Sequence, residues 1–178
     1  MEMQELTQLL NRHGSEMTVE HQKMLEMVYQ QLKKIAKSQK FKVSQQELNT
    51  TALVNEAWIK LNKNDKIFSN RNHFFATSAI AMRHILLNQA KKQTSRGISQ
   101  PLEEDSLVDN ASEALWFLDL EKHLQQLGEY SKRLEEVFVY RYFGGMKLEE
   151  IAELMSLSKR TVNRDWKKAK LMLSVALG

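Results

Sequence analysis

The sequence predicts an all-α protein made of two small helical domains, and three of its features support this prediction. Apolar residues recur at spacings of three and four in several segments, which is typical of amphipathic helices. None of the segments shows the strict alternation that marks a β-strand. The 178-residue chain has one proline and six glycines, so few positions would interrupt a helix.

Composition narrows the class of protein further. No apolar run approaches the roughly 20 residues of a membrane-spanning helix. The first residues, MEMQELTQLL, lack the apolar core of a signal peptide, so we expect a cytoplasmic protein. There is no cysteine and the five histidines show no ligand-like spacing, so we expect neither a metal nor another cofactor. The chain shows no recognisable catalytic constellation, so we do not expect an enzyme.

In the first half, residues 25–36, 54–61 and 74–92 carry helical periodicity. The middle segment is predicted to bury Val54, Ala57, Trp58 and Leu61, and its opposite side carries Ala52, Asn55, Glu56 and Ile59. An apolar Ile59 among polar neighbours suits a protein contact, although a single exposed isoleucine is also common by chance. In the third segment we expect Phe75 to be buried rather than to stack on bases.

The apolar periodicity stops between residues 93 and 111, where Gly97 and Pro101 accompany serine, aspartate and asparagine. Five acids and no cation lie between Glu103 and Glu113. We therefore predict a helical domain over residues 1–93, an acidic linker over 94–112 and a second helical domain over 113–178. Whether the two domains pack together is left open.

The second domain is predicted to contain four helices. Residues 114–127 and 130–143 form the first two, separated by Gly128, and the pair Gly144-Gly145 ends the second. The segment 148–173 then resembles a helix-turn-helix, in which the second helix enters a DNA groove. Ser158 is placed to cap that helix, and the small Ala152 suits a close crossing of the two helices.

The second helix of this motif is strongly basic. Six cations and one acid, Asp165, lie between Lys159 and Lys170, which favours a polyanionic partner. Val162, Trp166 and Ala169 form its predicted inward face, with Trp166 as a core residue. Arginine suits guanine and asparagine suits adenine, whereas lysine suits phosphate. The candidate DNA contacts are Ser158, Lys159, Arg160, Thr161, Asn163, Arg164, Lys167 and Lys168. A lysine-rich exposed helix can also serve solubility alone.

The first half of the chain indicates which class of DNA-binding protein this is. The chain resembles a bacterial RNA polymerase sigma factor of the extracytoplasmic-function (ECF) class. The resemblance is carried by TALVNEAWIKL (residues 51–61), by IFSNRNHFFATSAIAMRHILLNQAKK (residues 67–92) and by the C-terminal helix-turn-helix. Arg164-Asp165-Trp166 is similar to a subgroup with this tripeptide in the recognition helix. Many members have an acid where this chain has Ala52, which is a departure from the wider pattern.

The resemblance implies two sites in the first domain. It implies docking on the clamp helices of the β′ subunit through Ala52, Asn55, Glu56 and Ile59. It also implies contact with the −10 element, in which the polar loop 68–73 captures an extruded base. The −10 candidates are Asn70, Arg71, Asn72, His73, Arg83, His84, Asn88 and Lys91. The second domain is implied to read the −35 element and to touch the flap of the β subunit.

The predicted function is therefore a sigma factor that brings core RNA polymerase to promoter DNA and assists strand opening. The acidic linker can mimic nucleic acid inside the polymerase or can be merely solvated. The sequence leaves open whether an anti-sigma factor binds the chain. Two alternatives remain, namely a helix-turn-helix regulator that binds DNA alone as a dimer, and a helical adaptor that binds only protein.

Overall fold

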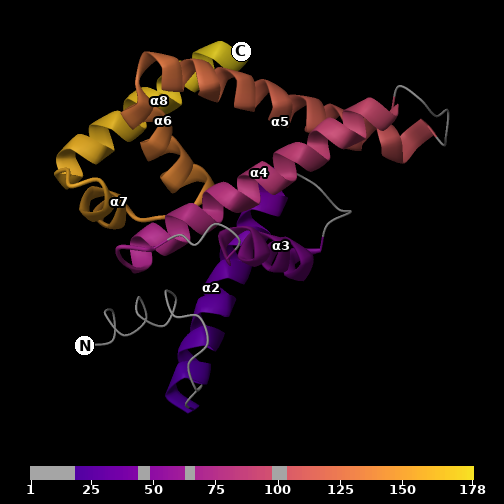
Figure 1. Cartoon of the computed structure of the whole chain (residues 1–178). Helices are drawn as coiled ribbons and strands as arrows, with labels where there is room; N and C mark the ends of the chain where they lie inside the picture. The colour runs from indigo at the N-terminus through magenta and orange to yellow at the C-terminus, as the bar shows by residue number, and fades with distance from the viewer. Residues whose placement is uncertain (1–18, 44–48, 63–66, 98–103) are drawn as a thin grey trace.

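A computed structural model describes residues 19–43, 49–62, 67–97 and 104–178, and every regular element in these ranges is helical. The all-α prediction is thus confirmed. In chain order the elements are α2 (Val19–Val43), α3 (Thr50–Asn62), α4 (Arg71–Gly97), α5 (Glu104–Tyr130), α6 (Lys132–Phe138), the π-helical turn η1 (Val139–Phe143), α7 (Leu148–Leu154) and α8 (Lys159–Leu177) (Figure 1).

The long helix α4 runs through the middle of the molecule (Figure 1). Helices α2 and α3 lie on one side of it, and α5 to α8 lie on the other. Contacts join α4 to both groups, including α5, η1 and α7. Because α4 belongs to the first predicted domain, this arrangement places the two predicted domains in direct contact.

The first half is held by apolar side chains of α2, α3 and α4. Leu32, Leu53 and Met82 are at most 2% exposed. Phe74 packs edge-on against Trp58 and Phe68, with ring centroids 6.2 and 5.0 Å apart. Phe75 is also buried, which confirms its predicted place in the core and leaves it unavailable for base stacking.

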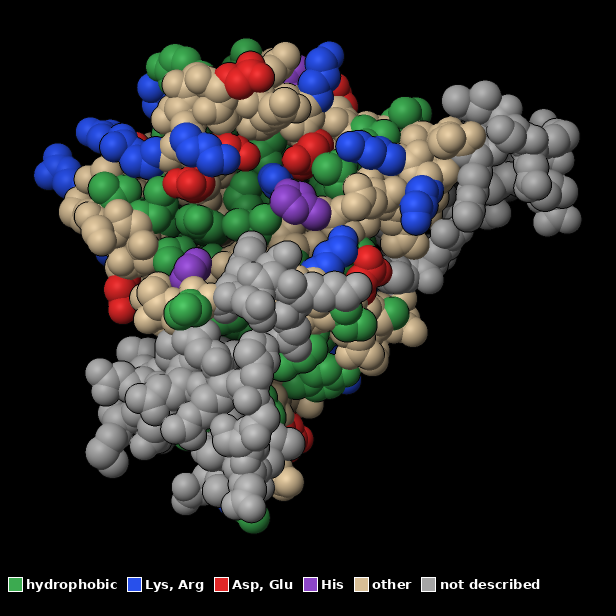
Figure 2. Space-filling view, viewed as in Figure 1, with side chains coloured by type: hydrophobic (Ala, Val, Ile, Leu, Met, Phe, Trp, Pro, Cys, Tyr) green, Lys and Arg blue, Asp and Glu red, His purple; other side chains and the backbone are tan. Residues whose placement is uncertain are grey.

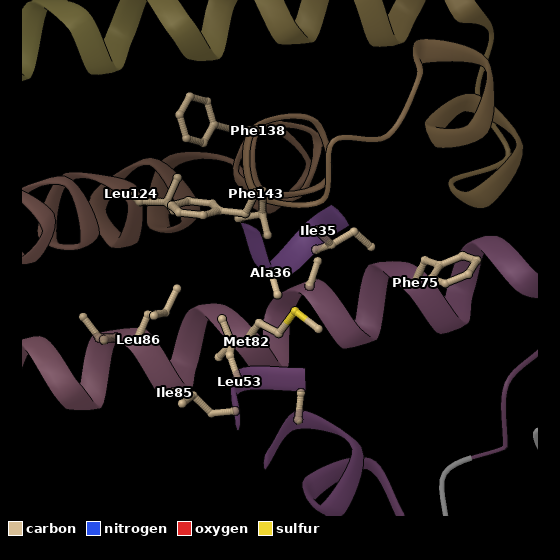
Figure 3. Packing of buried hydrophobic residues seen from close by; sticks show 14 of the residues in the cluster. Ile35, Ala36, Leu53, Phe75, Met82, Ile85, Leu86, Leu124, Phe138 and Phe143 are labelled. Carbon is tan, nitrogen blue, oxygen red and sulfur yellow. The ribbon is translucent and has the colours of Figure 1, made fainter. Parts of the chain in front are cut away.

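The core continues without a break into the second half. Phe143 and Leu124 face the region of Met82, Ile35 and Ala36 in the close view of Figure 3. Near the start of α4, Ala76 joins a second buried cluster whose other members come from the C-terminal half: Val137, Met146, Ile151, Ala152 and Val162. The two halves therefore share buried apolar surface, which answers the question of packing that the sequence left open.

Helix boundaries differ from the predicted ones around the linker. Helix α4 continues to Gly97 and α5 begins at Glu104, so much of the stretch 94–112 is helical. Glu103 and the rest of 98–103 lie outside the described residues. Serine, aspartate and asparagine only weaken a helix interior, whereas glycine and proline end it more strongly, so their accumulation made the predicted linker too long.

The break before α6 also lies elsewhere than predicted. Helix α5 passes through Gly128 and ends at Tyr130, and Ser131 adopts an extended conformation before α6. A Cβ at position 128 would collide with the carboxylate of Glu135, so a larger residue there would require this flexible side chain to move. The predicted helix end at Gly144-Gly145 is confirmed, because η1 ends at Phe143 and Gly145 has a φ of 65°.

Candidate nucleic-acid and polymerase interfaces

Helix α7 and the corner after it hold the recognition helix in place. The backbone N–H of Lys147 donates to Glu150 Oε2 at 2.7 Å, which satisfies a free donor where α7 begins. Ile151 and Ala152 are buried against α8, as predicted for the close crossing. The chain then turns through Ser156, whose φ is 54°, while Leu157 N–H donates to Ala152 O at 2.8 Å.

Ser158 caps α8, as predicted from its position. Its hydroxyl oxygen accepts from the backbone N–H of Thr161 at 3.1 Å, and its own backbone is extended. This bond satisfies one of the donors that every helix N-terminus leaves free. The first turn of the recognition helix is therefore fixed locally.

Replacing Ser158 with alanine is expected to lower the free energy of unfolding by about 1 kcal/mol, because the cap is lost. For a chain of this size the melting temperature should fall by about 2–4 °C. Ser174→Ala is the matched control, since Ser174 lies on the same helix, is exposed and bonds only within its last turns. Equal melting temperatures for the two variants would contradict the capping role.

The inward face of α8 is apolar, as predicted. Val162, Ala169 and Leu173 are at most 4% exposed. Trp166 is half-buried and packs against both core clusters, with its ring 5.5 Å from that of Phe138. Trp166 therefore lies on the inward side of α8, as predicted, but at the edge of the core rather than inside it.

Asp165 is a buried residue that sequence reasoning missed. It is 3% exposed, and its Oδ2 lies 2.8 Å from Nε of Arg133 on α6. Arg164 Nε is a more distant partner at 3.7 Å. Its spacing of three from Val162 and of four from Ala169 is the sequence signal that places Asp165 on the inward face.

The outward face of α8 carries the predicted −35 contacts. Ser158, Lys159, Arg160, Arg164, Lys167 and Lys168 are exposed, and Thr161 and Asn163 are half-buried. An open depression brings together Arg160, Thr161, Asn163, Arg164 and Lys167. Lysine and arginine side chains gather at the edge of the molecule where α8 begins (Figure 2). This face can therefore meet a duplex without rearrangement of the helix.

Two lysines at this surface have partners within the protein. Lys159 pairs with Glu149 of α7, and the hydrogen bond from this lysine lowers the pKa of the Glu149 carboxyl. Lys168 Nζ donates to the hydroxyl of Tyr130 at 3.2 Å and lies over its ring. Both lysines are exposed residues, so these contacts do not bury them.

The predicted −10 loop is shorter than expected, because α4 already begins at Arg71. Asn70 caps this helix through its Oδ1, which accepts from the N–H of His73 at 2.8 Å. His73 Nδ1 lies 3.2 Å from the backbone nitrogen of Ser69. Arg71 and Asn72 therefore lie in the first turn of a helix, and only residues 68–70 of the predicted loop are not helical.

Most of the −10 candidates remain accessible, but Arg83 does not. His84, Asn88 and Lys91 are exposed along α4. Arg83 is 5% exposed and pairs with Glu121 of α5 at 3.3 Å, so it cannot reach DNA in this arrangement. Asn72 donates to Glu153 of α7 at 3.2 Å. The sequence could not show either contact, because both partners lie in the other half of the chain.

The predicted polymerase-docking residues lie together on the outer side of α3. Ile59 is 53% exposed, Asn55 and Glu56 are exposed, and Ala52 is half-buried beside the helix start. The N–H of Ala52 donates to Asn49 Oδ1 at 2.7 Å, which caps α3. The opposite side is buried, since Val54, Ala57 and Leu61 are at most 5% exposed.

A second apolar surface was not predicted. A groove between α5, the α6–η1 segment and α8 is lined mainly by Trp116, Leu120, Phe138, Tyr142, Trp166, Leu171 and Leu177, with Lys167 and Lys170 at its edge. Trp116 and Leu171 are large apolar side chains left 41% and 65% exposed. Exposed apolar side chains that lie together in this way form a candidate protein contact.

Among the described residues, no helix combines the length and apolarity that crossing a membrane requires. The same residues contain no group of three or more histidine, aspartate and glutamate side chains arranged to hold a metal ion.

Comparison with known proteins identifies the family. The family model described as ECF sigma factor matches residues 3–177, which is nearly the whole chain. Searches for similar curated proteins and for similar solved structures found no match. Because the matched range contains both the α3–α4 surfaces and the helix-turn-helix, the chain belongs to the ECF sigma factor family.

Proposed function

We propose that this sigma factor directs core RNA polymerase to promoters through two surfaces, without catalysis of its own. Helix α8 reads the −35 element, and the α3–α4 region docks on the polymerase and contacts the −10 element. The observation that carries the proposal is the recognition helix itself. It is capped by Ser158, anchored from behind by Val162 and Asp165, and covered with exposed cations in front.

The side chains along α8 differ in the DNA groups that they suit. Arg160, Asn163 and Arg164 lie near its start and around the same depression, so they are the proposed readers of base edges. Lys167 and Lys168 lie one turn further along and suit phosphate, with Ser158, Lys159 and Thr161 beside the corner. Phosphate contacts of this kind make binding fall steeply with salt.

Two apolar surfaces support contact with the polymerase. The exposed Ile59, flanked by Asn55, Glu56 and Ala52, is the proposed dock for the clamp helices of the β′ subunit. The groove around Trp116 and between α5 and α8 is the proposed contact with the flap of the β subunit. Each surface offers apolar side chains with polar neighbours, as in the central part of protein interfaces.

The polar start of α4 is the part of the protein that we propose assists strand opening. Asn70, Arg71, Asn72 and His73 lie at the start of α4, where they can offer hydrogen bonds to a base extruded from the −10 element. His84, Asn88 and Lys91 continue the polar surface along α4. Because RNA polymerase and promoter DNA are the partners, we also propose a cytoplasmic location.

We also assign the chain to the subgroup with Arg-Asp-Trp in the recognition helix. Asp165 pairs with Arg133 and Trp166 packs against Phe138, so two residues of the tripeptide fasten α8 to α6. Arg164 remains 71% exposed for DNA. This division of roles explains why an acid lies within an otherwise basic helix.

A gel-shift experiment on a promoter library distinguishes this proposal from an independent regulator. For a sigma factor, we expect specific DNA to be retarded only when core polymerase is also present. A regulator would shift its target by itself, and a protein-only adaptor would shift no DNA under either condition. Selective enrichment of a DNA sequence by the isolated chain would contradict the proposal.

A further inference from the structure

A single buried carboxylate in the helix-turn-helix domain lies between two arginines. Asp165 is 3% exposed on the inward side of α8. Its Oδ2 lies 2.8 Å from Nε of Arg133 on α6, and its Oδ1 lies 3.7 Å from Nε of Arg164, the preceding residue of α8. The side chain of Arg164 is 71% exposed, whereas that of Arg133 is 48% exposed. The carboxylate is therefore close to one arginine that anchors α8 and to another that is proposed to read DNA.

Arg133 does not use up the hydrogen-bonding capacity of Asp165. Within the described part of the chain, Asp165 Oδ2 has no hydrogen-bond partner, although Arg133 Nε is close enough for an ion pair. An ionised carboxylate can accept several hydrogen bonds, and a guanidinium can donate two in parallel. Asp165 can thus still bind a second guanidinium, and Arg164 is near enough to supply one by rotating its side chain.

Arg164 is the cation that can replace Arg133 beside this carboxylate. Lys168 lies three positions after Asp165 on the helix, but its Nζ donates to the Tyr130 hydroxyl at 3.2 Å and lies 5.1 Å from the centre of that ring. A buried charge that has lost its partner is costly. Loss of Arg133 would therefore draw the Arg164 guanidinium toward Asp165.

That rotation would take Arg164 away from DNA. Its side chain lines the open depression on the outward face of α8, together with Arg160 and Asn163. A guanidinium that recognises guanine uses two parallel N–H donors. The same two donors cannot serve a buried carboxylate at the same time. The partner of Asp165 therefore decides whether Arg164 is available for a base edge.

We propose that Arg133 is a positioning residue for −35 recognition, which neutralises Asp165 from α6 and so leaves the Arg164 guanidinium free to bind a base. Arg133 acts through Asp165 and does not itself bind a base. An anchor alone would hold α8 in place, whereas this role also fixes the direction of one DNA-reading side chain. The inference rests on the proposed function, because it requires that α8 reads the −35 element.

The test measures −35 discrimination one base pair at a time. Holoenzyme formed from core polymerase and the full chain is bound to a panel of promoters, each with one base pair of the −35 element replaced. Arg164→Ala identifies the base pair that Arg164 reads, where preference for the cognate base should fall by at least about fivefold. We expect Arg133→Ala to lose preference at this position and to keep it at the positions read by Arg160 and Asn163. An equal loss at every position would mean that α8 has merely shifted, which overturns the proposal.

Further variants test the coupling between the two arginines. In the Arg164→Ala background, Arg133→Ala should cause no additional loss of discrimination, because both changes remove the same contact. Adding Asp165→Asn to Arg133→Ala removes the competing charge and should restore the preference, and Arg133→Lys should keep most of it. Lys132→Ala removes the adjacent exposed cation, so it is the matched control and should change discrimination at no position.

The orientation of Arg164 can also be measured in the free protein. Nuclear magnetic resonance of the arginine Nε–H groups in isotope-labelled protein reports their exchange with water, and the Arg164 signal is the one missing from Arg164→Ala. In the wild type this group should exchange quickly, because the side chain is exposed. In Arg133→Ala a hydrogen bond to Asp165 should slow the exchange, and unchanged exchange overturns the proposal. If Arg133→Ala lacks native helical content, Arg133→Gln replaces it in both experiments, since glutamine removes the charge but keeps a donor.

The outcomes separate the inference from the function on which it rests. Holoenzyme that shows no preference among the promoters contradicts the sigma-factor function and, with it, the role of Arg133 in recognition. Holoenzyme that prefers the cognate −35 element, but loses nothing in Arg164→Ala or keeps full preference at that position in Arg133→Ala, overturns the inference alone.

Discussion

Replacing Arg160 and Arg164 with alanine is expected to abolish discrimination of the −35 element while binding to core polymerase survives. Both side chains are exposed at the front of α8, and each bidentate contact to a base contributes about 1–3 kcal/mol of discrimination. Loss of both should therefore reduce the preference for the cognate −35 sequence by at least about 30-fold. The measurement is initiation by polymerase holoenzyme on promoters with cognate and scrambled −35 elements.

The matched control removes two exposed cations from elsewhere. Lys37 lies on α2 and Lys122 on α5, so the double change Lys37→Ala, Lys122→Ala alters the net charge equally but leaves α8 intact. We expect this control to keep its −35 preference. Loss of core binding in the Arg160 and Arg164 variant would mean that the polymerase contact has been assigned to the wrong surface.

Replacing Arg133 with alanine is expected to cause the largest loss of stability among single surface changes in the helix-turn-helix domain. Asp165 would be left buried with only Arg164, 3.7 Å away, as a partner. Removing one partner of a fully buried ion pair costs about 3–5 kcal/mol. Because the Arg133 side chain is itself 48% exposed and Arg164 remains near Asp165, we expect the lower end, about 3 kcal/mol. The melting temperature should fall by about 6–12 °C.

Two further variants make this prediction specific. Lys132→Ala removes the neighbouring cation, whose pair with Glu135 is solvent-exposed on the lysine side, so it should cost less than about 1 kcal/mol. Adding Asp165→Asn to Arg133→Ala removes the unpaired buried charge and should recover part of the loss. If the melting temperatures of Arg133→Ala and Lys132→Ala differ by less than about 2 °C, the anchoring role of Asp165 is wrong.

The elements that could be predicted from the sequence are those whose signals are local. Helical periodicity identified the helices, Ser158 marked the start of the recognition helix, and Gly144-Gly145 marked the end of the helix before it. Burial of Phe75 and the inward placement of Trp166 followed from their positions on helical faces. In each case the signal is a residue type or a spacing within a few positions along the chain.

The features that were missed depend on partners far away in sequence. Gly128 looked like a helix end, but α5 passes through it and Glu135 approaches it from the next helix. Arg83 looked like a DNA contact, but Glu121 holds it in the interior. Gln39 carried no signal, although its side chain joins α2 to a carbonyl 104 positions away. Contacts of this kind appear only once the two halves are placed together.

The measurement that tests the central claim most directly is transcription in vitro from a promoter library, with core RNA polymerase in the presence and absence of this protein. A sigma factor should convert core enzyme from no specific initiation to initiation at a defined subset of promoters, and the selected promoters should share −35 and −10 sequences. Unchanged initiation by core enzyme, or an effect seen only when another sigma factor is added, would contradict the account.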